Sequence, residues 1–164
     1  MKTRLLLLVA LPLILFTAFP ASAQKLKSRY DKFKDQTETE INFTSAGLWH
    51  SLLITHSGQK PNADAHIEWV ISSLAFDTHD KDPRSMTLLL DGQRVSMKGE
   101  FDPTPAIQHH YIGTVDFRVM LTPELLDTLI KAKTIEGQIG RFEFKLKPEH
   151  QRNFAAALNY VRSN

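Results

Sequence analysis

Residues 36–43 read QTETEINF, and this stretch decides the fold class. Every second residue from Thr37 to Phe43 is apolar or β-branched, and the residues between them are Gln, Glu or Asn. Successive side chains of an extended strand point to opposite faces, so this period of two predicts a half-buried β-strand.

The segments that follow keep this β pattern. Residues 48–55 (LWHSLLIT) are apolar and partly β-branched, and Ser57-Gly58 follows them. In residues 65–76 (AHIEWVISSLAF), Ile67, Trp69 and Ile71 fall on one face and polar residues fall largely on the other. Both segments therefore predict strands.

Further along the chain, Asp91-Gly92 lies between two β-prone runs in residues 86–97 (MTLLLDGQRVSM). This dipeptide is favoured in a two-residue type I′ turn, because both of its positions need a positive φ, so we expect a hairpin here. Residues 101–105 contain two prolines and predict a loop. Residues 111–121 alternate again and predict a strand.

The last third of the chain changes to helical signals. Thr122-Pro123 provides an N-cap hydroxyl and a proline at the first helical position, followed by an apolar stripe at helical spacing. Residues 134–146 predict a hairpin that turns near Ile139-Gly140. Pro148 then begins a closing helix, whose predicted buried stripe is Phe154, Ala155, Leu158 and Val161.

Together these segments predict a mainly β protein, either an antiparallel sandwich or a strongly bent sheet, with two short C-terminal helices. An α+β arrangement is the alternative. We place one β-rich domain at residues 36–164, after an N-terminal lead-in at residues 24–35. The lead-in is basic and carries Tyr30 and Phe33, which we expect to dock on the domain.

The N-terminus predicts export. Lys2 and Arg4 precede an apolar run over residues 5–19, and Ala21-Ser22-Ala23 follows. This pattern is typical of a secretory signal peptide at residues 1–23, cleaved after Ala23. The run is shorter than the roughly 20 residues of a membrane span, so we expect no span after cleavage. The expected location is the periplasm or the cell exterior.

The charge and cysteine counts exclude several classes of function. The chain has 20 Lys and Arg against 18 Asp and Glu, and two of the basic residues, Lys2 and Arg4, belong to the signal segment. The remainder is therefore neutral when its histidines are uncharged, so its charge favours neither nucleic acid nor anionic lipid as a partner. With no cysteine, thiol chemistry and disulfides are excluded.

Histidines are the candidate metal ligands. His50 and His56 share a face of one predicted strand but lie about 20 Å apart at 3.3 Å per residue. His109 and His110 are adjacent, so in extended chain they point to opposite faces. Any metal site would need partners from elsewhere, and no His-Glu-x-x-His motif occurs. The possible ligands are His50, His66, His79, His109 and His110, with Asp77, Asp80 and Asp82.

The aromatic residues are the candidate ligand contacts. Trp49, Trp69 and Phe117 could line a small apolar pocket between sheets, although alternating aromatic residues in strands are more often core. No Gly-x-Ser-x-Gly nucleophile motif, phosphate-binding loop or dinucleotide fingerprint is present in the sequence. We therefore expect no catalytic residues and no cofactor.

Two stretches resemble a known group of proteins. SRYDKFKDQT (residues 28–37) and LLDTLIKAKTIEGQIGRFEFKL (residues 125–146) are similar to uncharacterised exported bacterial proteins with a Tyr-Asp-x-Phe-x-Asp-x-Thr opening. The resemblance implies an exported bacterial β-rich domain of this size. It implies no activity and no site residues.

The sequence thus predicts an exported, non-enzymatic domain that binds a small apolar ligand or a protein partner from the cell envelope. One alternative is a metal-binding protein or a metal-dependent hydrolase that uses the histidines. Another is a structural or adhesion protein of the envelope that pairs through an exposed strand edge.

Overall fold

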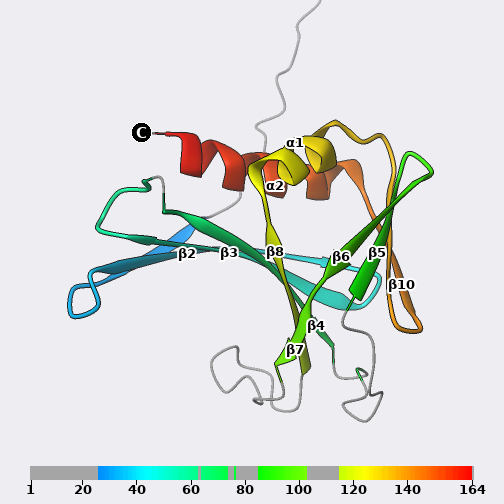
Figure 1. The fold of residues 1–164 in the computed structure, drawn as a ribbon, viewed down its shortest axis with the longest axis horizontal. Coiled ribbons are helices and arrows are strands. Elements are labelled where there is room, and N and C mark those ends of the chain that lie inside the picture. Colours follow the sequence, from blue (N-terminus) through cyan, green and yellow to red (C-terminus); the bar gives the residue numbers. More distant parts are fainter. Residues whose placement is uncertain (1–25, 63, 74–75, 77–84, 103–114, 164) are drawn as a thin grey trace, which may run out of the picture.

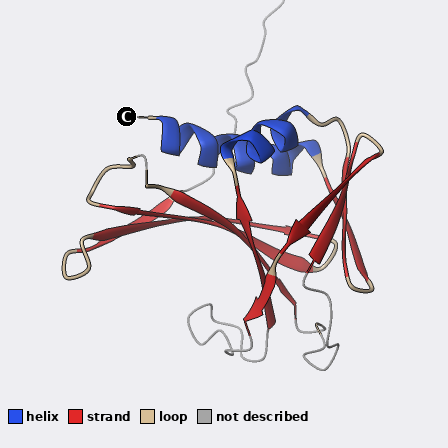
Figure 2. Ribbon diagram, viewed as in Figure 1, coloured by secondary structure: helices blue, strands red, loops and turns tan. Residues whose placement is uncertain are grey.

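The computed structural model describes residues 26–62, 64–73, 76, 85–102 and 115–163. These residues form two antiparallel β-sheets and two helices (Figures 1 and 2). The mainly β class predicted from the alternating pattern is therefore confirmed. The predicted signal peptide, residues 1–23, lies outside the described residues.

The larger sheet has six strands in the order β1-β2-β3-β4-β8-β7. Buried and exposed residues alternate along its long strands, as the period of two predicted. The strands are β1 (Lys27–Asp31), β2 (Gln36–Ser45), β3 (Leu48–Ser57), β4 (His66–Ser73), β7 (Glu100–Asp102) and β8 (Val115–Leu121).

The smaller sheet has four strands in the order β10-β9-β5-β6, and it is built from two hairpins. In the first hairpin the turn residues Asp91 and Gly92 have φ values of 51° and 82°, so both positions have the predicted positive φ. The second hairpin turns at Gly140, as predicted. The strands are β5 (Ser85–Leu90), β6 (Gln93–Lys98), β9 (Ile135–Ile139) and β10 (Phe142–Leu146).

Gly99 lies where the chain passes from the small sheet into the large one, between β6 and β7. A Cβ atom at this position would lie 2.2 Å from Cζ of Phe117 and 2.7 Å from the carbonyl oxygen of Arg118. Only glycine fits so close an approach. Beyond it, Phe101 and Asp102 pair with β8, so the predicted loop is wrong for these two residues, because tertiary pairing overrides the local pattern. Residues 103–105 lie outside the described part of the chain.

The predicted lead-in contributes an edge strand to the large sheet. Strand β1 pairs with β2 from Lys27, opposite Glu40, to Asp31, opposite Gln36. Its side chains are almost all exposed, so no apolar alternation marks it in the sequence. The expected docking of Phe33 is wrong, since this side chain is 90% exposed at the turn that follows β1.

Both predicted helices are present, α1 (Pro123–Lys131) and α2 (Pro148–Arg162). The N-cap hydroxyl of Thr122 accepts a hydrogen bond from the backbone N–H of Leu125 at 3.2 Å, as its position predicted. The two helices lie together along one side of the sheets (Figure 1). None of the described helices is long and apolar enough to cross a membrane.

The core fills the space between the inward faces of the two sheets and the helices. Trp69 lies at its centre, with its ring centroid 5.9 Å from that of Phe144 and 5.1 Å from that of Phe154. The large sheet, the small sheet and α2 each contribute one of these three rings. The core therefore joins all the layers and leaves the outer faces of the sheets to solvent.

Candidate functional site

The three aromatic residues predicted to contact a ligand are not brought together. Trp69 and Phe117 are fully buried in the core. Trp49 is half-buried and belongs to the opposite face of the large sheet, because its neighbours Leu48 and His50 are the buried residues of β3. These side chains cannot line a single pocket.

The predicted metal ligands are likewise not gathered by the part of the chain that the structure describes. His50 is buried in the core, whereas His66 is exposed at the start of β4 on the outer face. Among the described residues, no group of three or more His, Cys, Asp or Glu side chains could hold a metal ion. The remaining predicted ligands lie outside the described residues: His79, His109, His110, Asp77, Asp80 and Asp82.

His50 is a buried histidine that lies among aromatic core side chains. Its ring stacks on Phe43 with centroids 4.9 Å apart, and its Nδ1 accepts a hydrogen bond from the indole N–H of Trp69 at 3.2 Å. Burial is the main cause that lowers the pKa of His50 to about 3, and the nearby His150 contributes to this lowering. A neutral imidazole held this way is a core element, and it cannot shuttle protons near neutral pH.

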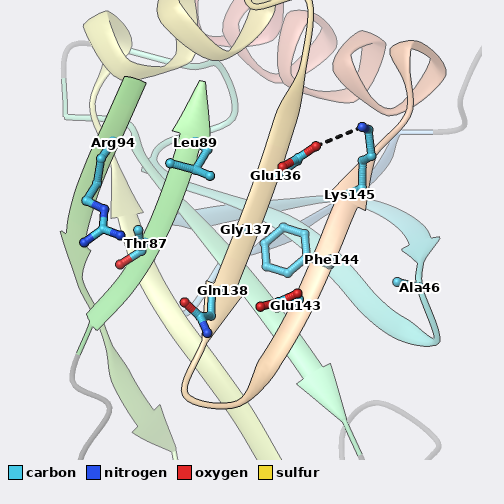
Figure 3. Close-up of a pocket in the computed structure, with 10 residues that line it drawn as sticks. All are labelled: Ala46, Thr87, Leu89, Arg94, Glu136, Gly137, Gln138, Glu143, Phe144 and Lys145. Atoms are coloured by element: carbon cyan, nitrogen blue, oxygen red, sulfur yellow. Dashed lines mark hydrogen bonds and ion pairs between the residues drawn. The ribbon is translucent and has the colours of Figure 1, made fainter. Parts of the chain in front are cut away.

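The outer face of the small sheet has an open groove of about 380 Å³ (Figure 3). We call it the small-sheet groove. It is formed by the side chains that alternate with the buried residues of β5, β9 and β10, and by Ala46 of the β2–β3 turn at its edge. Its lining residues are Ala46, Thr87, Leu89, Arg94, Glu136, Gly137, Gln138, Glu143, Phe144 and Lys145.

The floor of the groove depends on one glycine. Gly137 pairs with Phe144 across β9 and β10, and a Cβ atom at Gly137 would lie 2.1 Å from Cζ of the Phe144 ring. The ring therefore packs directly against the backbone of β9 from the inner side. Ser45 fixes the edge of the groove, because its hydroxyl donates a hydrogen bond to the carbonyl oxygen of Lys145 at 2.6 Å.

The charges in the groove are only partly paired. Lys145 Nζ lies 2.8 Å from Glu136 Oε1, and both side chains are largely exposed. Arg94 on β6 and Glu143 on β10 are exposed, and within the described residues neither makes a hydrogen bond or an ion pair. Three spacings between strands, about 14 Å at 4.8 Å each, separate β6 from β10. Arg94 is in register with Lys145, so Glu143 is also displaced by two residues, about 7 Å, along the strands, and the two residues lie about 16 Å apart. The groove therefore presents an unpaired cation at one edge of the sheet and an unpaired anion at the other.

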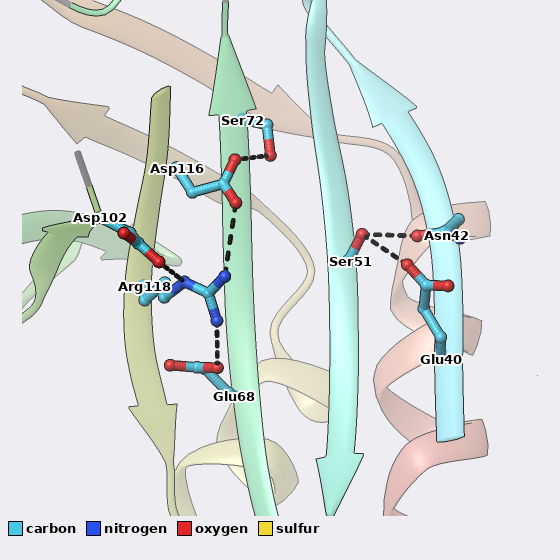
Figure 4. Close-up of polar contacts among 8 residues, drawn as sticks. All are labelled: Glu40, Asn42, Ser51, Glu68, Ser72, Asp102, Asp116 and Arg118. Carbon is cyan, nitrogen blue, oxygen red and sulfur yellow. Dashed lines mark hydrogen bonds and ion pairs between the residues drawn. The ribbon is translucent and has the colours of Figure 1, made fainter. Parts of the chain in front are cut away.

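The outer face of the large sheet carries a different arrangement, centred on Arg118 (Figure 4). The guanidinium group lies 3.2 Å from Glu68, 3.5 Å from Asp102 and 3.5 Å from Asp116. Asp116 is only 2% exposed and also accepts a hydrogen bond from Ser72 at 2.6 Å. Next to this cluster, the hydroxyl of Ser51 donates to Asn42 and lies near Glu40.

Arg118 is thus surrounded by three carboxylates, one of which, that of Glu68, accepts a hydrogen bond from it. An anionic ligand would be repelled by the surplus of carboxylates, and a cationic ligand would compete with the guanidinium for the same oxygens. This cluster holds β4, β7 and β8 together across the sheet. The small-sheet groove is therefore the better candidate for binding.

The groove could not be predicted from the sequence, because the groove forms only when strands β5 and β9, which lie far apart in the chain, pair with each other. The pairing of β5 with β9 brings Leu89 beside Glu136 and Thr87 beside Gln138. The alternation within each hairpin does indicate which residues face outward. No local signal indicates that the two hairpins pair side by side.

Comparison of the chain with protein-family models, with curated proteins and with solved structures finds no match in any of the three. A function for this protein must therefore rest on its own residues.

Proposed function

We propose that this protein is an exported, non-catalytic domain that binds a short segment of a protein partner in the small-sheet groove. The single observation that carries the proposal is an open groove whose two edges present an unpaired cation, Arg94, and an unpaired anion, Glu143. Export is supported by the signal-peptide pattern of residues 1–23.

The size of the groove favours a peptide segment. The distance of about 16 Å between Arg94 and Glu143 corresponds to about five residues of extended chain at 3.4 Å each. A volume of about 380 Å³ falls in the lower range of ligand sites, which span roughly 300 to 1,000 Å³. The ligand would place an acidic group near Arg94 and a basic group near Glu143.

A protein segment is favoured over a small apolar ligand. Half of the ten lining residues carry a charged or amide side chain, and the apolar side chain that β5 adds to the groove, Leu89, is half-buried. The aromatic residues that would suit an apolar ligand, Trp69 and Phe117, are fully buried against other core side chains.

A displayed peptide library panned on the purified protein tests the proposal. We expect enriched peptides that carry an acidic and a basic residue about five positions apart. Their affinity should fall at least tenfold for Arg94→Glu. The matched control is Met120→Asp on the outer face of the large sheet, where Met120 is 54% exposed. No enrichment, or equal affinity for both variants, would refute the proposal. So would robust hydrolysis across ester, peptide and glycoside substrates that a single substitution abolishes.

A further inference from the structure

The turn between β1 and β2 presents an isolated apolar side chain. Phe33 is 90% exposed, the highest fraction among the large hydrophobic residues that the structure describes as exposed. Burying a phenylalanine side chain contributes about 1.5 to 3 kcal/mol relative to leaving it in water. A partner that covers this ring would therefore gain a hydrophobic anchor.

Hydrogen bonds fix the backbone of the turn that carries Phe33. One carboxylate oxygen of Asp31 accepts hydrogen bonds from the backbone N–H groups of Phe33, at 2.9 Å, and of Lys34, at 3.4 Å. The hydroxyl of Tyr30 donates to Asp35 at 2.8 Å, and Asp35 closes the turn with a φ of 49°. Because these contacts fix the backbone of the turn before binding, little backbone entropy remains to be lost when a partner covers the ring.

Two lysines flank the exposed ring. The ammonium group of Lys32 lies 5.0 Å from the centroid of Phe33, and Lys34 is the next residue of the chain. The neighbouring carboxylates of Asp31 and Asp35 are engaged within the turn. The tip therefore presents one aromatic ring between two cations, and we call residues 32–34 the basic tip.

The small-sheet groove has the complementary features. Its floor includes Leu89 and the Gly137–Phe144 pair, and its unpaired acid is Glu143. We propose that the basic tip of one copy of this protein binds in the small-sheet groove of a second copy, with Phe33 against Leu89 and a tip lysine beside Glu143. This inference rests on the proposed function and names the partner as a second copy of the chain. The tip engages only the acidic edge of the groove, at Glu143, because the carboxylates of Asp31 and Asp35 are already hydrogen-bonded within the turn and are not offered to Arg94.

The two surfaces lie at opposite ends of the molecule. In Figure 1 the β1–β2 turn is at one end of the longest axis, and the hairpins of the small sheet are at the other. A tip therefore cannot reach the groove of its own chain. Head-to-tail binding of two different surfaces does not close on itself in a pair, so it leads to open-ended chains of copies or to rings.

Sedimentation velocity over a series of protein concentrations tests the inference. We expect the average mass of the wild-type protein to rise steadily with concentration. Phe33→Ala removes the aromatic ring of the tip and keeps the groove, whereas Leu89→Asp disrupts the groove and keeps the tip. Each variant alone should therefore remain monomeric. An equimolar mixture of the two should form dimers and nothing larger, because only one intact tip and one intact groove can meet.

A second groove variant guards against loss of folding. Glu143→Lys changes an exposed side chain and should also prevent association, whereas Met120→Asp on the large sheet should leave it unchanged. A monomeric wild-type protein at every concentration would overturn the inference. So would association that survives Phe33→Ala, or a mixture that stays monomeric.

Failure of this self-association can be distinguished from failure of the proposed peptide binding. If library peptides bind the groove while the wild-type protein stays monomeric, the inference fails and the proposed function stands. Vesicles of anionic lipid provide the remaining arm of the test. Sedimentation of the monomeric protein with these vesicles, lost in Phe33→Ala, would assign the tip to a membrane surface and overturn the inference.

Discussion

Two arginines on the outer faces of the two sheets have opposite surroundings. Arg118 on the large sheet is half-buried and lies within 3.5 Å of three carboxylates. Arg94 on the small sheet is exposed, and within the described residues it has no acidic partner. Arg118 therefore stabilises the fold through its ion pairs, whereas the guanidinium group of Arg94 remains available to bind a ligand.

The strand neighbours explain the difference. Arg118 pairs with Glu100 on β7 and with Val70 on β4, and acids occupy neighbouring positions on both of these strands. Arg94 lies on an edge strand, and its single cross-strand neighbour is Leu89. An arginine beside a leucine at a sheet edge keeps all its donors available.

The largest expected effect is on the large sheet. Arg118→Met should lower the free energy of unfolding by about 3 kcal/mol, because it leaves the buried carboxylate of Asp116 without its cation. Arg94→Met, the matched change on the small sheet, should alter it by less than about 0.5 kcal/mol. Urea denaturation measures both. Equal losses in the two variants would abolish the distinction between the arginines.

A second prediction concerns the inward side of the large sheet. The pKa of His50 is about 3 in the folded protein and about 6.5 in the unfolded chain, so below pH 6.5 the unfolded chain binds more protons. The contribution of neutral His50 to the free energy of unfolding is therefore fully present above pH 6.5. It falls by about 1.4 kcal/mol per pH unit as the pH drops toward 3. At pH 5 the loss should be about 2 kcal/mol.

Urea denaturation at pH 7 and pH 5 checks this slope. His50→Met should flatten it, whereas His66→Gln on the outer face should leave it unchanged. The lowered pKa of His150 adds a contribution of the same sign, so some slope should remain in His50→Met. A slope unchanged by His50→Met would show that the buried imidazole is not its source.

The smallest effect is expected at the ion pair of the groove. Lys145 and Glu136 are 65% and 48% exposed, and pairs of this kind contribute between zero and about 1 kcal/mol. Lys145→Met should therefore change the free energy of unfolding by less than about 0.5 kcal/mol. Thermal denaturation at low and high salt measures it. A loss as large as that of Arg118→Met would mean that the groove wall is part of the stabilising framework.

Much of the fold was predictable because its signals are local. Alternation over residues 36–43, the Asp91-Gly92 turn and the Thr122-Pro123 cap each specify one element from a few neighbouring residues. The alternation even placed His50 and His56 on the same face, and both are buried.

The site could not be predicted in the same way. Arg94, Leu89 and Glu143 come together through pairing of strands that lie far apart in the sequence. Strand β1 was missed for a related reason: it pairs at an edge and buries almost nothing, so its sequence carries no apolar rhythm. A turn such as that at Phe33 also gives no sign in the sequence of whether its aromatic ring docks or projects.

The most direct test of the account compares the two outer faces in one binding experiment. A peptide selected on the wild-type protein is titrated by calorimetry against Arg94→Met and, separately, against Met120→Asp. The account predicts at least tenfold weaker binding to Arg94→Met and unchanged binding to Met120→Asp. Unchanged binding to Arg94→Met together with a loss in Met120→Asp would place the binding surface on the large sheet and contradict the account.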